Sequence, residues 1–123
     1  MVGASLLILL INPAQTKAAP YGGTARSVPG IIQAEDFDTG GEGMGYHDTS
    51  ASNTAGSYRP SEGVDIENST NPSGAGYNVG DTKAGEWMSY TINVTTSGTY
   101  TIQAIVTSGG AGNLVLSSSK LIC

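Results

Sequence analysis

Two stretches, residues 88–94 and 100–107, alternate apolar and polar side chains, and this alternation constrains the fold more than any other feature of the sequence. The apolar positions are Met88, Tyr90, Ile92 and Val94, followed by Tyr100, Ile102, Ala104 and Val106. A period of two is typical of a strand that buries one face. The residues between the two stretches, TTSGT, include a glycine, as hairpin loops often do. We therefore predict an antiparallel hairpin with one apolar face.

The overall composition agrees with strands and turns rather than helices. The chain has 18 glycines in 123 residues, and a glycine costs about 1 kcal/mol relative to alanine inside a helix. Short strands with polar, glycine-rich connections indicate an all-β domain, either a sandwich or a barrel. The formal net charge is -5 and the five basic residues are scattered. Nucleic acids and anionic membranes require clustered Lys and Arg, so we expect neither as a partner.

The N-terminus predicts export from the cell. Residues 2–11 form an unbroken apolar run, which is too short to span a membrane but has the length of a signal-peptide core. We expect a signal peptide over residues 1–18, a linker over 19–29, a single domain over 30–123, and a secreted, extracellular protein. The alternative for the apolar run is a buried core element. The single cysteine, Cys123, leaves no pair for a disulfide within the chain.

A metal site is suggested by the stretch 31–37, IIQAEDF, which we predict to be a strand. Side chains two positions apart leave the same face of a strand, so Gln33 and Glu35 would point the same way. Calcium prefers several oxygen ligands of this type. A solvated or hydrogen-bonded pair is the alternative interpretation.

The long polar stretch 38–63 precedes a second strand candidate at 64–67, VDIE. A loop of this length inside a small domain is usually functional or disordered, so it is a candidate binding rim. Carboxylates are numerous around it, but their spacing pairs none of them across a cleft as glycoside hydrolysis requires. His47 and Asp48 have no serine in a nucleophile-elbow context nearby. We therefore expect no catalytic residue in this chain and no enzyme activity of its own.

Three separated segments together resemble a known family. They are PGIIQAEDFDTGGEGMGYHDT, GSYRPSEGVDIE and GYNVGDTKAGEWMSYTINVTTSGTYTIQAIVTSGGAG, spanning most of residues 29–113. In this order they resemble family 6 carbohydrate-binding modules, which are noncatalytic β-sandwich jelly rolls attached to secreted bacterial polysaccharide hydrolases. The resemblance implies an antiparallel β-sandwich of the jelly-roll type. It also implies that the pattern would continue through further strands, so we expect the sandwich to be incomplete at its C-terminus.

The resemblance also implies residues for two sites. A structural calcium would be held by Gln33 and Glu35 with a backbone carbonyl near Arg59. A sugar site on the loops would use Glu42 and Tyr46, and in many relatives an aromatic wall stands where this chain has Asp81. The only tryptophan, Trp87, lies on the strand face opposite Met88 and is expected mainly to pack.

These observations lead to one main hypothesis and two alternatives. The main hypothesis is noncatalytic binding of a polysaccharide such as xylan or β-glucan, which targets an attached catalytic hydrolase domain to plant, algal or fungal cell-wall glycan. One alternative is an N-terminal fragment of a glycoside hydrolase whose catalytic domain lies outside this chain. The other is a calcium-stabilised structural sandwich without a sugar site.

Overall fold

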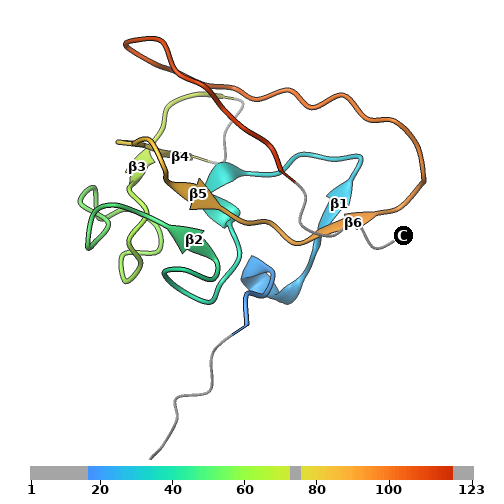
Figure 1. Ribbon diagram of the computed structural model, residues 1–123, viewed down its shortest axis with the longest axis horizontal. Coiled ribbons are helices and arrows are strands. Elements are labelled where there is room, and N and C mark those ends of the chain that lie inside the picture. Colours follow the sequence, from blue (N-terminus) through green and yellow to red (C-terminus); the bar gives the residue numbers. More distant parts are fainter. Residues whose placement is uncertain (1–16, 73–75, 118–123) are drawn as a thin grey trace, which may run out of the picture.

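The computed structural model describes residues 17–72 and 76–117 (Figure 1). Its regular elements are two 3₁₀ turns and six short strands. In chain order they are η1 (Tyr21–Gly23), β1 (Arg26–Val28), η2 (Ala34–Asp36), β2 (Tyr46–His47), β3 (Ile66–Asn68), β4 (Tyr77–Val79), β5 (Trp87–Met88) and β6 (Ile92–Val94). The all-β fold class predicted from the sequence is confirmed.

The six strands pair two by two in the described part of the chain. β3 and β4 are antiparallel, and so are β2 and β5. β1 and β6 are parallel, with Arg26 opposite Ile92 and Val28 opposite Val94. Figure 1 shows the β2–β5 pair between the other two pairs, so that elements distant in sequence are joined at the centre. The strand expected at 64–67 is present as β3, shifted towards the C-terminus by two residues at its start.

The core is small and lies between β2, β3 and the residue that follows η2. Its buried apolar side chains are Phe37, Tyr46, Val64 and Ile66. The Phe37 and Tyr46 rings meet edge to face with centroids 5.3 Å apart, a favoured geometry for aromatic pairs. Partly buried side chains on β4 and β5, including Val79 and Met88, pack against this cluster. The short strands are therefore held to a common apolar centre.

The hairpin predicted for residues 88–94 and 100–107 is wrong. β6 pairs with β1 instead, and this pairing is extended by a bond from the Arg26 amide to the Thr91 carbonyl (2.9 Å). Residues 100–107 form no strand, and Ile102 and Ile105 are 68% and 71% exposed. Alternation shows which face of a stretch can be buried, but a strand also needs a partner for its backbone groups. No described strand pairs with 100–107.

The strand predicted over 31–37 is also wrong, because its centre turns into η2. The Asp36 amide donates to the Gln33 carbonyl (3.1 Å), which closes the turn. Glu35 and Phe37 are both buried, whereas Ile31 is 82% exposed. In a 3₁₀ turn neighbouring side chains are about a third of a turn apart, so Gln33 and Glu35 do not share a face as they would on a strand.

Two segments, a signal peptide and a linker, are expected to precede the domain, and the structure describes mainly the linker. Residues 19–29, expected as a linker, contain η1 and β1, and Ala19 forms an antiparallel bridge with Thr39. These residues therefore belong to the folded unit. The expected signal peptide, residues 1–18, lies outside the described residues except for its last two positions. Among the described residues, no helix has the length and hydropathy to cross a membrane.

The small core makes each buried side chain important for stability. Ile66 is 0% exposed, so Ile66→Ala is expected to lower the free energy of unfolding by about 2–5 kcal/mol through lost burial and a residual cavity. The matched control, Ile102→Ala, removes a side chain that is 68% exposed and should change the free energy of unfolding by less than about 0.5 kcal/mol. Urea denaturation followed by circular dichroism measures both. Equal losses in the two variants would contradict the assigned core.

Candidate functional site

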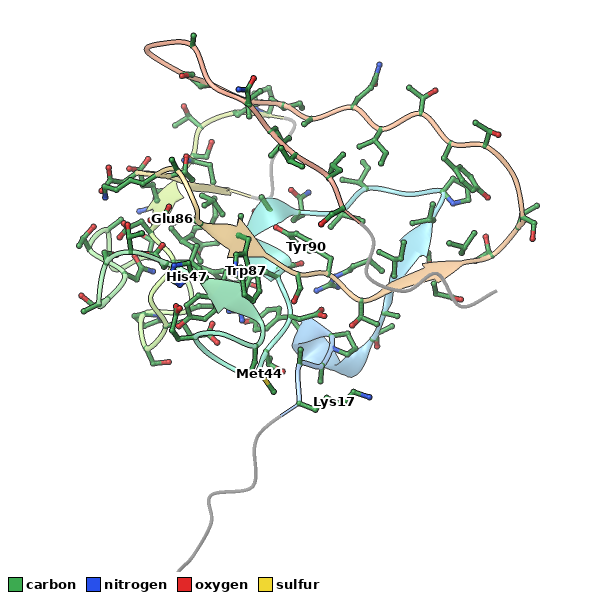
Figure 2. The ribbon with its side chains drawn as sticks, in the orientation of Figure 1. Lys17, Met44, His47, Glu86, Trp87 and Tyr90 are labelled. Atoms are coloured by element: carbon green, nitrogen blue, oxygen red, sulfur yellow. The ribbon has the colours of Figure 1, made fainter. Side chains whose placement is uncertain are left out.

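The β2–β5 pair presents two side chains on one face and two on the other. His47 lies opposite Trp87, and Tyr46 lies opposite Met88. Residues directly opposite in an antiparallel pair project from the same face of the sheet. Tyr46 is 5% exposed and belongs to the core, whereas Trp87 is 43% exposed. Trp87 and His47 therefore share the outer face of the pair (Figure 2).

Glu42 extends this outer face through its contact with His47. Its Oε1 is hydrogen-bonded to His47 Nδ1, and its Oε2 accepts from the Asp48 amide (3.0 Å). The hydrogen bond from His47 is the main reason that the pKa of Glu42 is lowered. The same bond raises the pKa of His47, assisted by the charges of Glu42, Glu86 and Asp48. The face thus carries an aromatic ring beside an imidazole and a carboxylate.

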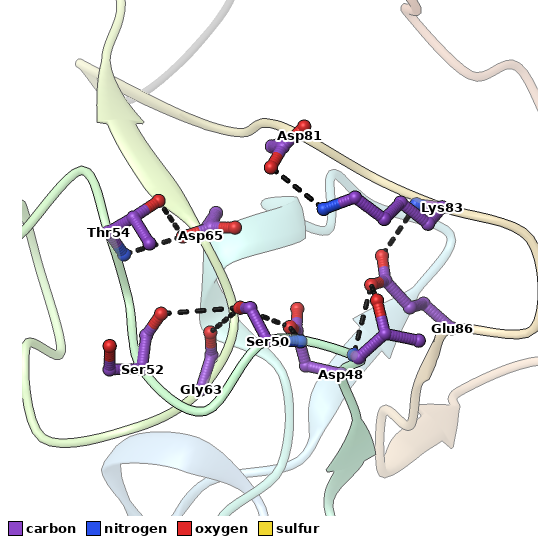
Figure 3. Close-up of polar contacts among 10 residues, drawn as sticks. Asp48, Ser50, Ser52, Thr54, Gly63, Asp65, Asp81, Lys83 and Glu86 are labelled. Atoms are coloured by element: carbon purple, nitrogen blue, oxygen red, sulfur yellow. Dashed lines mark hydrogen bonds and ion pairs between the residues drawn. The ribbon is translucent and has the colours of Figure 1, made fainter.

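Glu86 joins the two segments that carry Trp87 and His47 (Figure 3). Its Oε1 accepts from the Thr49 amide (3.0 Å) and the Thr49 hydroxyl (2.6 Å), two residues after His47. Its Oε2 accepts from the Lys83 amide (2.7 Å) in the turn before β5. Burial alone would raise the pKa of Glu86, but the hydrogen bonds from Thr49 and Lys83 lower it. Both carboxylate oxygens are therefore used to hold the turn before Trp87 against the loop after β2.

Asp81 begins the turn that leads to Trp87. It is exposed, has a φ of 42°, and forms an ion pair with Lys83 (2.9 Å from Nζ to Oδ2). Positive φ is unusual for a side chain other than glycine, though Asp tolerates it better than most. An aromatic wall is expected at this position in many relatives, whereas here it holds a charged pair.

The structure separates the three residues expected to contact sugar. Glu42 lies on the outer face beside His47. Tyr46 is buried, and its hydroxyl accepts from the Gly63 amide (2.7 Å), so the side chain expected to contact sugar packs in the core. Asp81 lies at the start of the Trp87 turn. Trp87 itself was expected mainly to pack, although its alternation with Met88 already placed it on the face opposite the apolar side chains.

A model of a known protein family matches a large part of the chain. Residues 54–120, more than half of the chain, match the family 6 carbohydrate binding module. The chain belongs to this family. The resemblance stated from its motifs is thus confirmed, and the module binds carbohydrate without being an enzyme by itself. No curated protein matches the sequence.

The region around Glu35 is where the expected calcium ion would bind, and its side chains show whether it could do so. The Glu35 side chain is 3% exposed and its Oε1 has no hydrogen-bond partner among the described groups. Burial, aided by the nearby Asp36 charge and opposed by a backbone hydrogen bond, raises the pKa of Glu35. A buried carboxylate oxygen without a donor fits the preference of a hard cation for oxygen ligands. No group of three or more His, Cys, Asp or Glu side chains gathers as a metal site within the described ranges, so other ligands would be amide or carbonyl oxygens.

The Arg59 side chain donates hydrogen bonds to two backbone carbonyls of this region. Arg59 Nη1 donates to the Glu35 carbonyl (3.2 Å) and to the Phe37 carbonyl. Arg59 has a φ of 57°, and its own carbonyl accepts from the Glu62 amide (3.2 Å). Of the three ligands that the resemblance implies, the Glu35 carboxylate is buried with an oxygen that has no partner among the described groups, whereas its turn does not place the Gln33 side chain on the same face.

The Glu42–His47 contact has a direct titration test, because His47 is the only histidine. Its pKa should lie above the ordinary value of 6.5, and Glu42→Gln should move it back towards that value. Proton NMR of the imidazole against pH measures this, with Glu67→Gln as the control. The contribution of this pair to stability is fully present between the ordinary pKa of Glu42 and the ordinary pKa of His47. It is lost as pH falls through the lowered pKa of Glu42 or rises through the raised pKa of His47. An unchanged titration in Glu42→Gln would show that the contact is not formed.

Proposed function

We propose that the module binds a cell-wall glycan on the outer face of the β2–β5 pair, with Trp87 as the stacking ring. The observation that carries this proposal is the register of the pair, which sets the 43% exposed Trp87 directly opposite His47. The apolar face of a pyranose ring covers a flat indole while its hydroxyls stay free for hydrogen bonds. An exposed tryptophan beside polar side chains suits that type of ligand.

The groups around Trp87 supply the hydrogen bonds that such a ligand needs. The carboxylate of Glu42 has acceptor positions beyond those used by His47 and the Asp48 amide, because each carboxylate oxygen accepts more than one hydrogen bond. The free ring nitrogen of His47 can donate or accept according to its tautomer. Sugar hydroxyls both donate and accept, so these two side chains match them.

The biological role we propose is to hold an attached hydrolase on its substrate. The module is exported, and a catalytic domain in the parent chain acts on plant, algal or fungal cell-wall glycan such as xylan or β-glucan. A weak binding site joined to a catalytic domain raises the local concentration of substrate without new chemistry. An exposed site with one stacking ring is suited to reversible attachment of this kind.

Trp87→Ala is the decisive change. Retardation of the protein in native gels that contain xylan, laminarin or a cellulose derivative measures affinity for each glycan. Removing the ring should weaken binding of the retained glycan at least about tenfold, because the sugar face loses its apolar contact. Tyr100→Ala is the matched control, since Tyr100 is also a partly exposed aromatic residue (36%) but lies outside the β2–β5 pair. Equal retardation of Trp87→Ala and the unchanged protein would reject this face and favour a structural sandwich without a sugar site here.

We also propose that calcium binds at Glu35, whose buried Oε1 has no hydrogen-bond partner among the described groups; Gln33 and the Arg59 carbonyl are the other ligands that the family resemblance implies. When bound, the ion supplies positive charge to a buried carboxylate. Without the ion, the raised pKa of Glu35 means that its contribution to stability is fully present below the ordinary value of 4.5 and is lost as pH rises through the raised pKa. Calcium should remove this loss.

Thermal denaturation near neutral pH with calcium and with a chelator tests the site. Calcium at about 100 times its Kd should stabilise the unchanged protein by about 2.7 kcal/mol. Glu35→Gln should abolish this gain, and it should leave the calcium-free protein equally or more stable because no buried charge remains. Glu67→Gln, an exposed acid outside the region, is the control. A calcium response that persists in Glu35→Gln would place the ion elsewhere.

A further inference from the structure

Residues 95–117, which follow β6, form a long exposed arc at the periphery of the fold (Figure 1). Each of these residues is exposed to solvent, and none of them belongs to a strand. Seven of the twelve large apolar side chains that are exposed among the described residues lie between positions 100 and 116. Soluble proteins rarely leave extended apolar surface uncovered, and such surface often marks an interaction site. The arc is therefore a candidate contact surface.

The part of the arc over residues 100–107 has a backbone that is free to pair. Its amide and carbonyl groups form no hydrogen bond with another described residue. The alternation of Tyr100, Ile102, Ala104 and Val106 would give this stretch one continuous apolar face in a strand. An unpaired stretch of this kind is a template for a strand supplied by another chain.

The distribution of charge indicates which kind of strand fits this stretch. All ten acidic residues lie between Glu35 and Glu86, and residues 87–119 contain no Asp, Glu, Lys or Arg. A charged partner finds no complement along the arc, whereas a neutral apolar strand does. Charged side chains commonly protect unpaired strands from pairing with other chains, and residues 100–107 contain none. The net charge of -5 lies outside the arc, so two copies of the chain can approach at this neutral segment without repulsion there.

Residues 100–107 are complementary to themselves. In an antiparallel pair of two copies centred on Gln103, Tyr100 of each copy lies opposite Val106 of the other. Ile102 likewise lies opposite Ala104. Residues directly opposite share a face, so this register gathers the four apolar residues of both copies on one side. A slip of one residue would set Tyr100 and Val106 against threonines.

We propose that two copies of this chain associate through residues 100–107, which pair as antiparallel strands across a two-fold axis at Gln103. Each contact then occurs twice, as in most symmetric protein dimers. The pairing covers side chains such as Ile102 and Val106, which are 68% and 74% exposed in the single chain. This inference does not depend on the proposed sugar site.

The association is measured by sedimentation velocity of the full 123-residue chain over about 1 to 100 µM. The mass should rise from one chain to two as concentration increases. Ile102→Lys should raise the Kd for association at least about tenfold, because a charge replaces an apolar side chain in both copies. Ile31→Lys is the matched control, since Ile31 is also an exposed isoleucine (82%) but lies outside the arc. Circular dichroism verifies that both variants keep the fold of the unchanged chain.

The register is tested by disulfide formation in a Cys123→Ser background. Gln103→Cys sets two cysteines directly opposite, with Cα atoms about 4.5–5.5 Å apart, which a disulfide spans. Thr101→Cys is the control, because its two copies would stand about 14 Å apart along the paired strands. Mild oxidation of dilute protein followed by non-reducing electrophoresis should therefore give a linked dimer for Gln103→Cys and not for Thr101→Cys.

Four outcomes would overturn the proposed dimer. The first is the mass of a single chain at every concentration. The second is the same Kd for Ile102→Lys and Ile31→Lys, or the same yield of linked dimer for the two cysteine variants. The third is assembly beyond two chains, which a closed two-fold pair does not allow. The fourth is association that Ile8→Lys abolishes and Ile102→Lys preserves, which would assign the contact to the apolar run at residues 2–11.

Discussion

The hydrogen bonds donated by the buried guanidinium of Arg59 are the interactions on which most of the fold depends. Its Nη atoms donate to the carbonyls of Glu35, Phe37 and Asp38, and its Cζ lies 3.5 Å from the centre of the Phe37 ring. Glu35 lies in η2, and Phe37 and Asp38 follow it; none of the three belongs to a strand of the described residues. A buried carbonyl without a donor is costly, so Arg59 replaces the sheet partner that this segment lacks. Its ion pair with Glu62 balances the charge within the same loop.

Two carboxylates, those of Asp38 and Glu86, accept hydrogen bonds from backbone amides of other segments. Asp38 is buried and accepts from the Thr91 amide (2.8 Å) and hydroxyl (2.7 Å), fifty-three residues away in sequence. Glu86 does the same for Thr49 and Lys83. With only four buried apolar side chains in the described core, the bonds between Asp38 and Thr91 and between Glu86 and Thr49 help to fix segments that are distant in sequence. Trp87 and His47 are held together by such a bond as well as by their strand pairing.

The sequence predicted those features that depend on local pattern. Glycine content and alternation gave the all-β class, and several motifs in order gave the family. Strand partners were not predictable, because β6 pairs with β1, more than sixty residues earlier, and alternation contains no information about distant edges. The turn at η2 depends on Arg59, whose conformation with φ of 57° has no clear local signal. The contact between Glu42 and His47 follows from the turn at Gly43, which no motif marked.

The charged pair at Asp81 and Lys83 changes what this surface can do. Where an aromatic side chain at position 81 would form one wall of a two-ring site, the only tryptophan stands six residues later, on a strand rather than on the turn. A ring fixed by strand pairing covers one face of a sugar, and the opposite face remains in water. Binding that depends on one ring gains less apolar contact per sugar unit, so useful affinity requires contacts with neighbouring units. For the sugar site proposed on Trp87, contacts with the units on either side of the stacked sugar would therefore add to the affinity.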